Sequence, residues 1–186
     1  MSPSTPGGEG NQMNLVLVRT ASSIEILAVE VYNVALGESD TKLPTEIQFD
    51  PAVADAAKLF RDHHQEHADA LAQATESIGG EPYEKPNKFL FDNVVAKELP
   101  NLTDQAKVVM FARTLEETAA GTYAFAASEL TTPALGQSIM SIGGVESRHA
   151  AALSLTLDGT GTDAVPRSFI DASPEGRVPD EALIQE

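Results

Sequence analysis

Apolar residues recur at intervals of three and four along four long segments of the chain. In the first segment they are Val18, Ala21, Ile24, Ala28, Val31 and Ala35. This spacing places apolar side chains on one face of an α-helix. The segments cover about residues 12–36, 51–78, 103–130 and 133–157. Each would form a helix roughly 37 Å long, and matched helices of this length predict an all-α bundle.

Residues that begin or end helices bound these segments. Pro51 suits the first turn of the second helix, and Gly79 and Gly80 end it. A long connection follows over residues 79–102, with a short helix predicted over residues 87–99. A long crossover at this point makes the two helical hairpins run parallel, so we expect an up-down bundle with one crossover.

The length of 186 residues suits one domain with a core of its own. We expect a flexible linker over residues 1–11, the bundle over residues 12–158 and a Pro-rich extended tail over residues 159–186. The N-terminal residues are rich in Ser, Pro and Gly, as in a disordered terminus or in what remains after an export signal or lipid anchor is removed. The tail after Pro166 has no periodicity, which indicates an extended strap or partial disorder.

The formal net charge is −16, from 28 acidic and 12 basic residues. Such a chain repels nucleic acid and anionic membrane surfaces and attracts cations, so no nucleic-acid partner is expected. The absence of cysteine excludes disulfides, zinc–thiolate sites and iron–sulfur clusters. No apolar run approaches the roughly 20 residues of a membrane-spanning helix, so no transmembrane segment is predicted.

The first and third segments share a polar pattern. Glu25 precedes Tyr32 by seven residues, and Glu116 precedes Tyr123 by seven residues. Seven residues are close to two helical turns, so each pair lies on one face of its helix. The repetition of the same pair at the same spacing indicates that the two halves of the chain are related.

The second and fourth segments repeat a second pattern. His64-x-x-His67 aligns with Glu146-x-x-His149 without a gap, and the Ala and Leu residues that follow also match. The chain therefore reads as a duplicated helical hairpin. Glu25, Glu116 and Glu146 fall on small or apolar stripes, and a buried carboxylate is very costly unless it is paired or binds a metal. Basic residues are few, so the pattern predicts metal ions in the core.

Taken together, these motifs resemble those of ferritin-like di-metal carboxylate proteins, such as bacterioferritins and rubrerythrins. In that family, one Glu comes from each of two helices and Glu-x-x-His from each of the other two. The resemblance covers all four segments but not the tail. It implies a ferritin-like four-helix bundle that holds one or two transition-metal ions, iron in the first place and manganese or zinc as alternatives.

The resemblance also implies a function, the oxidation of Fe(II) by oxygen or peroxide. In such a site Tyr32 and Tyr123 would hydrogen-bond to the ligand carboxylates, the alternative being ordinary packed aromatic residues. A homo-oligomer is compatible with the resemblance, but nothing in the sequence indicates the closed shell of an iron-storage protein. Similar ferritin-like proteins are often exported from bacteria, which favours an extracytoplasmic over a cytoplasmic location.

The chain departs from the family pattern at His64, where the family has a glutamate that bridges two metals. The resulting candidate ligands are Glu25, His64, His67, Glu116, Glu146 and His149. Imidazole does not bridge two ions as a carboxylate does, so a single ion held by Glu116, Glu146 and His149 is an alternative to a pair. A further alternative is a non-catalytic structural or stress-related protein that has lost its redox chemistry.

Other polar residues near the motifs have ordinary interpretations. Glu30 and Glu117 are rival carboxylates, but neither lies seven residues before a tyrosine. His63 is expected to face outward or to support a ligand. Glu66 and Arg148, which align with each other, are expected to face solvent.

Overall fold

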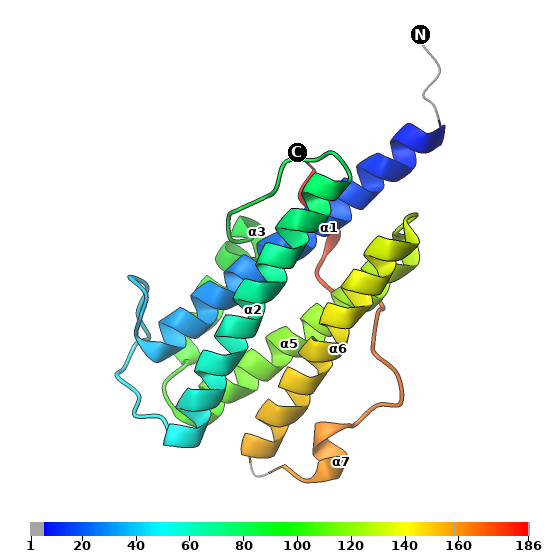
Figure 1. Ribbon diagram of the computed structural model, residues 1–186. Helices are drawn as coiled ribbons and strands as arrows, with labels where there is room; N and C mark the ends of the chain where they lie inside the picture. Colours follow the sequence, from blue (N-terminus) through cyan, green and yellow to red (C-terminus); the bar gives the residue numbers. More distant parts are fainter. Residues whose placement is uncertain (1–5, 158, 186) are drawn as a thin grey trace.

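The computed structural model describes residues 6–157 and 159–185, which are helical or irregular throughout. Four long helices form the bundle: α1 Pro6–Leu36, α2 Pro51–Ser77, α5 Gln105–Glu129 and α6 Pro133–Thr156. Helix α1 packs with α2 as one hairpin, and α5 packs with α6 as the other (Figure 1). The predicted all-α bundle is confirmed, and all helix ends except the start of α1 lie within two residues of the predicted ends.

Helix α1 begins earlier than the periodicity indicated. It starts at Pro6, so the linker predicted over residues 1–11 is wrong from that point on, while residues 1–5 lie outside the described residues. Proline suits a first helical turn because its missing N–H needs no partner there. Asn14 anchors this end, since its side chain accepts a hydrogen bond from Thr131 N at 3.0 Å. The apolar pattern begins only where α1 reaches the core, and it therefore missed the first turns.

The crossover between the hairpins is extended at first and then forms short helical turns. These are α3 Lys88–Leu90, the π-helical η1 Phe91–Val95, α4 Ala96–Glu98 and the 3-10 turn η2 Leu99–Asn101. Asn87 fixes their start, because its side chain accepts from Leu90 N at 3.1 Å and donates to Ser23 Oγ at 2.9 Å. The same side chain donates to the carbonyl of Ala182 at 2.8 Å, so one buried Asn joins the crossover, α1 and the C-terminal region.

The C-terminal region runs back along the bundle (Figure 1). After α7 Gly161–Ala164, residues 165–185 form a largely extended segment, which we call the C-terminal strap. It contains a turn at residues 174–176 and the 3-10 helix η3 Asp180–Ala182. Val178 N donates to Thr122 Oγ1 of α5 at 3.0 Å, and Ile184 N donates to Thr20 Oγ1 of α1 at 2.8 Å. Of the two forms expected for the tail, the structure therefore shows the extended strap, held between α1 and α5.

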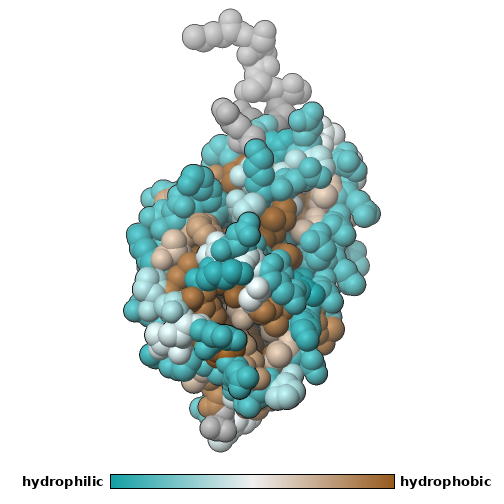
Figure 2. Space-filling view, turned by 90° about the vertical axis from the view of Figure 1, so that its left-hand side faces the viewer, coloured by the Kyte–Doolittle hydropathy of each residue, from teal (hydrophilic) through white to brown (hydrophobic). Residues whose placement is uncertain are grey.

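The surface is mixed in character. Figure 2 shows the face on the left of Figure 1, where hydrophobic side chains gather at the centre, which is hollowed in places, and hydrophilic side chains surround them. Among the described residues, no helix is both long and apolar enough to cross a membrane.

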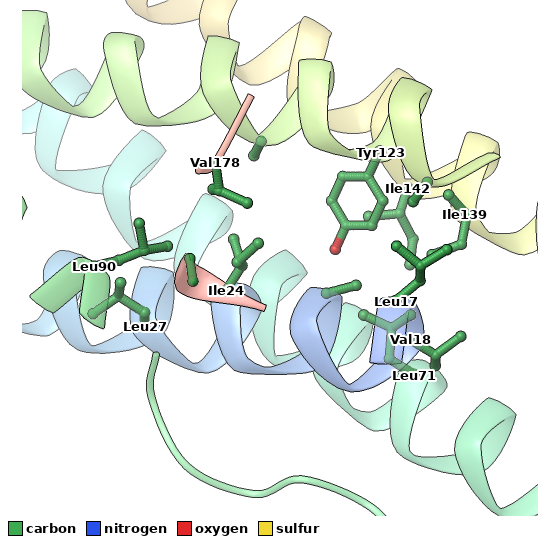
Figure 3. Close-up of a cluster of buried hydrophobic side chains, with 14 of the residues drawn as sticks. Leu17, Val18, Ile24, Leu27, Leu71, Leu90, Tyr123, Ile139, Ile142 and Val178 are labelled. Carbon is green, nitrogen blue, oxygen red and sulfur yellow. The ribbon is translucent and has the colours of Figure 1, made fainter. Parts of the chain in front are cut away.

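The core is filled by side chains from all four long helices. Val18 of α1, Leu71 of α2, Tyr123 of α5 and Ile139 of α6 lie close to one another, and each is at most 1% exposed (Figure 3). Truncation of such a leucine to alanine costs about 2–5 kcal/mol. Helices α5 and α6 approach closely at Gly143, because a Cβ atom there would lie 2.7 Å from the Cβ of Tyr123. This close packing fixes Tyr123, whose hydroxyl group reaches the polar centre of the bundle.

Candidate metal centre

Six polar side chains meet at one level of the bundle. They are Glu25 of α1, His64 and His67 of α2, Glu116 of α5, and Glu146 and His149 of α6. Five of them are at most 3% exposed, and the His67 side chain is 13% exposed. The structure thus brings together all six residues that the sequence singled out as candidate ligands.

The six side chains form two overlapping groups. Glu25, His64, His67 and Glu146 make one group, and His64, Glu116, Glu146 and His149 make the other. Within each group, one ligand atom from every residue lies within 4.8 Å of the others. Carboxylate oxygens mixed with imidazole nitrogens suit iron, manganese or zinc. The cluster can therefore hold metal, and His64 and Glu146 belong to both halves of it.

Two tyrosines cross between the hairpins to reach the carboxylates. The Tyr32 hydroxyl donates to Glu116 Oε1 at 2.5 Å, and the Tyr123 hydroxyl donates to Glu25 Oε1. Each tyrosine therefore serves the glutamate of the other hairpin, not the one seven residues before it. Burial, followed by the charge of the bonded glutamate, raises the pKa of both phenols well above its usual value, so both stay protonated donors.

His64 lies between two carboxylates, with one ring nitrogen facing each. Its Nδ1 is 2.6 Å from Glu25 Oε2, and its Nε2 is 3.2 Å from Glu116 Oε1. Burial alone would lower the pKa of His64, but Glu116 and Glu25 together raise it well above its usual value. His64 is thus placed to act as a cation between two anions.

Glu25 is fully satisfied by its neighbours. Besides the bond from Tyr123, its Oε2 atom lies 3.3 Å from His67 Nδ1 as well as close to His64. Burial raises the pKa of the Glu25 carboxyl, but the two imidazoles outweigh burial and bring the pKa to about 2. The group around Glu25 therefore neutralises itself with protonated histidines.

The other half of the cluster is not satisfied. Four buried atoms have no hydrogen-bond partner among the described residues: Glu116 Oε2, both carboxylate oxygens of Glu146 and His149 Nδ1. His149 Nδ1 lies 3.5 Å from Glu116 Oε2 and 3.7 Å from Glu146 Oε2. His67 Nδ1 is 3.1 Å from Glu146 Oε1, but in a direction that makes an ion pair and not a hydrogen bond. Buried polar atoms without hydrogen bonds are costly, so these convergent atoms fit a metal ion.

Glu146 is the carboxylate whose ionised form is least stabilised in this arrangement. Burial and the nearby charge of Glu25 raise the pKa of the Glu146 carboxyl to about 7, although His149 and His67 oppose the shift. A carboxylate that the protein itself does not stabilise is a good partner for an added cation, which would favour its ionised form.

His149 is held by His63 and Phe60, and support of a ligand was one of the two expectations for His63. His63 Nδ1 lies 3.0 Å from His149 Nε2, and the two rings are stacked with their centroids 5.2 Å apart. The Phe60 ring also stacks on His149, with the centroids 4.1 Å apart. These contacts turn the Nδ1 atom of His149 toward the carboxylates. The aligned residue in the other half is Val145, so the internal repeat carried no signal for His63.

The rival carboxylates lie elsewhere. Glu30 accepts a hydrogen bond from Ser39 Oγ at 2.5 Å, and Glu117 pairs with Arg113 at 2.9 Å on the surface of α5. Glu66 and Arg148 are exposed, as expected. None of these four side chains belongs to either group of the cluster.

Comparison with known proteins agrees with this architecture. A family model described as ferritin-like domain matches residues 14–159, which is well over half of the chain. Searches of curated proteins and of solved structures gave no match. The matched region contains all four long helices from Asn14 onward and every residue of the cluster. The chain therefore belongs to the ferritin-like domain family.

Proposed function

We propose that this protein binds one transition-metal ion, iron in the first place, through Glu116, Glu146 and His149, and uses it for oxidation by dioxygen or peroxide. The observation that carries the proposal is the convergence of unpartnered buried atoms from these three residues. Their donors are two carboxylates and one imidazole, a set that also accepts manganese or zinc. His64, the fourth member of the group, borders the same position.

The side chains around this position prepare it for an ion. The Tyr32 hydroxyl holds the Oε1 atom of Glu116, which leaves Oε2 as a ligand atom. His63 holds Nε2 of His149, which leaves Nδ1 as a ligand atom. Contacts of this kind fix ligand orientation in metal sites. Bound iron would supply electron transfer to the oxidant, while the protein supplies a buried and water-poor setting.

We infer one ion and not two because of the histidines on α2. The Glu25 carboxylate already has protonated partners in His64 and His67, whose pKa values are raised, that of His67 to about 9. Metal ligands must be deprotonated, so a second ion at Glu25 would have to displace protons from both imidazoles of α2. At the other position only one imidazole, His149, would lose a proton, although, despite burial, Glu116 and Glu146 raise its pKa as well. The protonated His64 thus supplies, beside Glu25, positive charge that a second metal ion would otherwise supply.

Metal content of the purified protein tests the proposal. We would express the protein with iron, manganese and zinc supplied in turn and count metal ions per chain by elemental mass spectrometry. We expect about one ion per chain, lost in His149→Ala because one of the three donors is removed. Arg148→Ala, an exposed change on the same helix, is the matched control and should keep the ion.

A second candidate function follows from the same charges. Because His64 and His67 lie in ion-pair distance of Glu25, part of the cluster is neutral without any metal, as in a bundle that serves only as a scaffold. A parent protein that binds no metal under any supply would establish this alternative. Two ions per chain would contradict both the single-ion site and the scaffold.

A further inference from the structure

An apolar cavity of about 250 Å³ opens beside the metal centre. One part of its wall is made by four residues of that centre, Glu25, Tyr32, His64 and Glu116. Most of the remaining wall is aliphatic or aromatic, with Ile24, Leu27 and Val31 from α1 and Phe111, Leu115 and Ala119 from α5 among its residues. A space of this character is not needed to bind a metal ion or dioxygen.

A second, smaller apolar cavity lies next to the first. This second cavity, of about 40 Å³, shares Val31, Val95, Phe111 and Ala112 with the wall of the first. The two spaces therefore lie on either side of one set of side chains, and the second borders the C-terminal end of α1 and the N-terminal end of α2. The combined shape suits a molecule that is longer than it is wide.

Two segments outside the four long helices close the cavity. The π-helix η1 contributes Val94 and Val95, and π-helical turns are frequent at functional sites. The C-terminal strap contributes Glu175, Arg177, Val178 and Pro179. Figure 3 shows Val178 near Ile24 and Leu90, so the strap reaches the crossover over the gap between α1 and α5.

The strap is fixed firmly in this place. A Cβ atom on Gly121 of α5 would lie 2.1 Å from the carbonyl oxygen of Gly176, so the two backbones are in direct contact there. Val178 is 4% exposed and Ala182 is 1% exposed. The strap is thus a structural wall of the cavity, which gives the C-terminal region a role that the bundle alone does not require.

The charge of the wall selects the kind of molecule that fits. Glu25 and Glu116 stand at the inner end, where both ring nitrogens of the cationic His64 are already occupied by them. Arg177 at the strap is already paired with Asp180 at 2.8 Å. The chain as a whole carries −16. An anionic ligand would therefore be repelled and would lose its hydration without a free partner. In size, the cavity exceeds the roughly 150 Å³ that holds benzene in an engineered protein core.

We propose that this cavity binds an uncharged, elongated apolar molecule, such as one with a short alkyl chain, and holds one end of it beside His64 and Glu116. Binding rests on the cavity alone. The contact between the bound molecule and a metal ion rests, in addition, on the function proposed above, for which this molecule would be the substrate class.

Titration calorimetry with two probes of matched length tests the binding. 1-Octanol is the neutral probe and octanoate is the anionic one, and both are added to the full chain prepared without metal. We expect octanol to bind at least about tenfold more tightly than octanoate, because the wall repels and desolvates a carboxylate. Equal affinities, or no heat from octanol in the folded protein, would overturn the proposal.

Two substitutions that fill the cavity from opposite sides locate the binding. Ala28→Leu on α1 and Thr118→Leu on α5 each place a larger side chain on the wall, and neither position is a candidate metal ligand. We expect each to weaken octanol binding about tenfold or more, since added bulk occupies the space of the ligand. Ala70→Leu makes the same change at an exposed position of α2 and should bind as the parent does. Unchanged affinity in a folded filling variant would contradict the proposed location.

Cobalt(II) separates this inference from the proposed function. If cobalt binds, its visible absorption should shift when octanol is added, because the ligand ends next to the metal. An unshifted spectrum with octanol bound would refute the contact. If cobalt does not bind at all, the proposed metal function fails, while calorimetry of the same protein still decides the cavity.

Discussion

At the scale of single residues, the histidine at position 64 sets the balance of charge within the cluster. His64 contacts one carboxylate from each hairpin, at 2.6 Å and 3.2 Å. A glutamate there would add a negative charge to three buried carboxylates, whereas an imidazolium removes one. The result is an asymmetric cluster in which Glu25 is neutralised internally and Glu146 is not.

The two tyrosines provide a matched test of this asymmetry. Tyr32→Phe removes the hydroxyl that orients Glu116, so we expect metal affinity to fall roughly 10–100-fold. Tyr123→Phe removes the corresponding bond to Glu25, which keeps His64 and His67 as partners, so the affinity should change little. Each change should lower the free energy of unfolding by about 1.5–3 kcal/mol, as for other hydrogen bonds to charged groups. Metal titrations of the two variants check this, and equal losses of affinity would argue against the single-ion site.

The pKa shifts give the metal-free protein a defined pH dependence. The pKa of Glu25 falls from 4.5 to about 2, so its stabilising contribution is present above about pH 4.5 and is lost as the pH falls toward 2. The pKa of His67 rises from 6.5 to about 9, so its contribution is present below pH 6.5 and is lost as the pH rises to 9. Glu146, with its pKa raised to about 7, acts in the same sense as His67 because its ionisation in the folded protein is unfavourable.

Thermal melts across pH test these signs. We expect the melting temperature of the metal-free protein to be higher near pH 5 than at pH 9, and to fall again below pH 4. A bound metal ion should reduce the loss on the alkaline side, since it stabilises the deprotonated ligands. A melting temperature that is constant from pH 5 to pH 9 without metal would show that the cluster does not carry these charges.

At the scale of elements, the close packing of α5 on α6 depends on one glycine. A Cβ atom at Gly143 would lie 2.7 Å from Tyr123, whereas one at Gly144 would meet nothing within 4 Å. Both residues lie inside α6, so they share the same helix propensity and differ only in what they face. Substitutions at the two glycines therefore distinguish the effect of tight packing on stability from the general cost of a glycine in a helix.

Alanine substitutions at the two glycines should change the free energy of unfolding in opposite directions. Gly143→Ala should destabilise the protein by about 1–3 kcal/mol, because the added methyl group displaces Tyr123. Gly144→Ala should stabilise it by roughly 0.5–1 kcal/mol, because alanine favours the helix at a position with room for it. Urea unfolding of both variants measures these differences, and two stabilising results would show that α5 and α6 can separate without cost.

Local signals explain which elements the sequence predicted well. Pro51, Gly79 and the apolar periodicity act over a few residues, so the bundle helices could be placed to within about two residues of their ends. The path of the strap could not be predicted, because it depends on contacts such as Val178 with Thr122 that join residues far apart in the chain. The π-turn of the crossover likewise has no local sequence signature.

The candidate site also has features that local sequence patterns predicted and features that they could not predict. The internal repeat identified Glu25, Glu116, Glu146 and the histidines at positions 67 and 149, because duplication leaves a spacing that can be read directly. It could not show that His64 would contact two carboxylates, that the tyrosines would cross between hairpins, or that His63 would reach His149. These relations arise only when the two hairpins pack, and the cavity beside them arises only when the strap closes over it.

At the scale of the whole molecule, one bundle combines a charged centre with an apolar space beside it. The two hairpins supply the centre, while the crossover and the strap wall off the space. The high negative charge of the surface favours the approach of cations and disfavours that of anions. Both proposals, a cation in the centre and a neutral ligand in the cavity, are consistent with that charge.

The position of the bound metal ion distinguishes one site from two, and anomalous diffraction measures that position. Crystals of the full chain grown with iron would be measured on both sides of the iron absorption edge. We expect one anomalous peak per chain, within bonding distance of Glu116, Glu146 and His149 and away from Glu25 and His67. A peak between Glu25 and His67, a pair of peaks, or no peak in iron-loaded crystals would contradict the account.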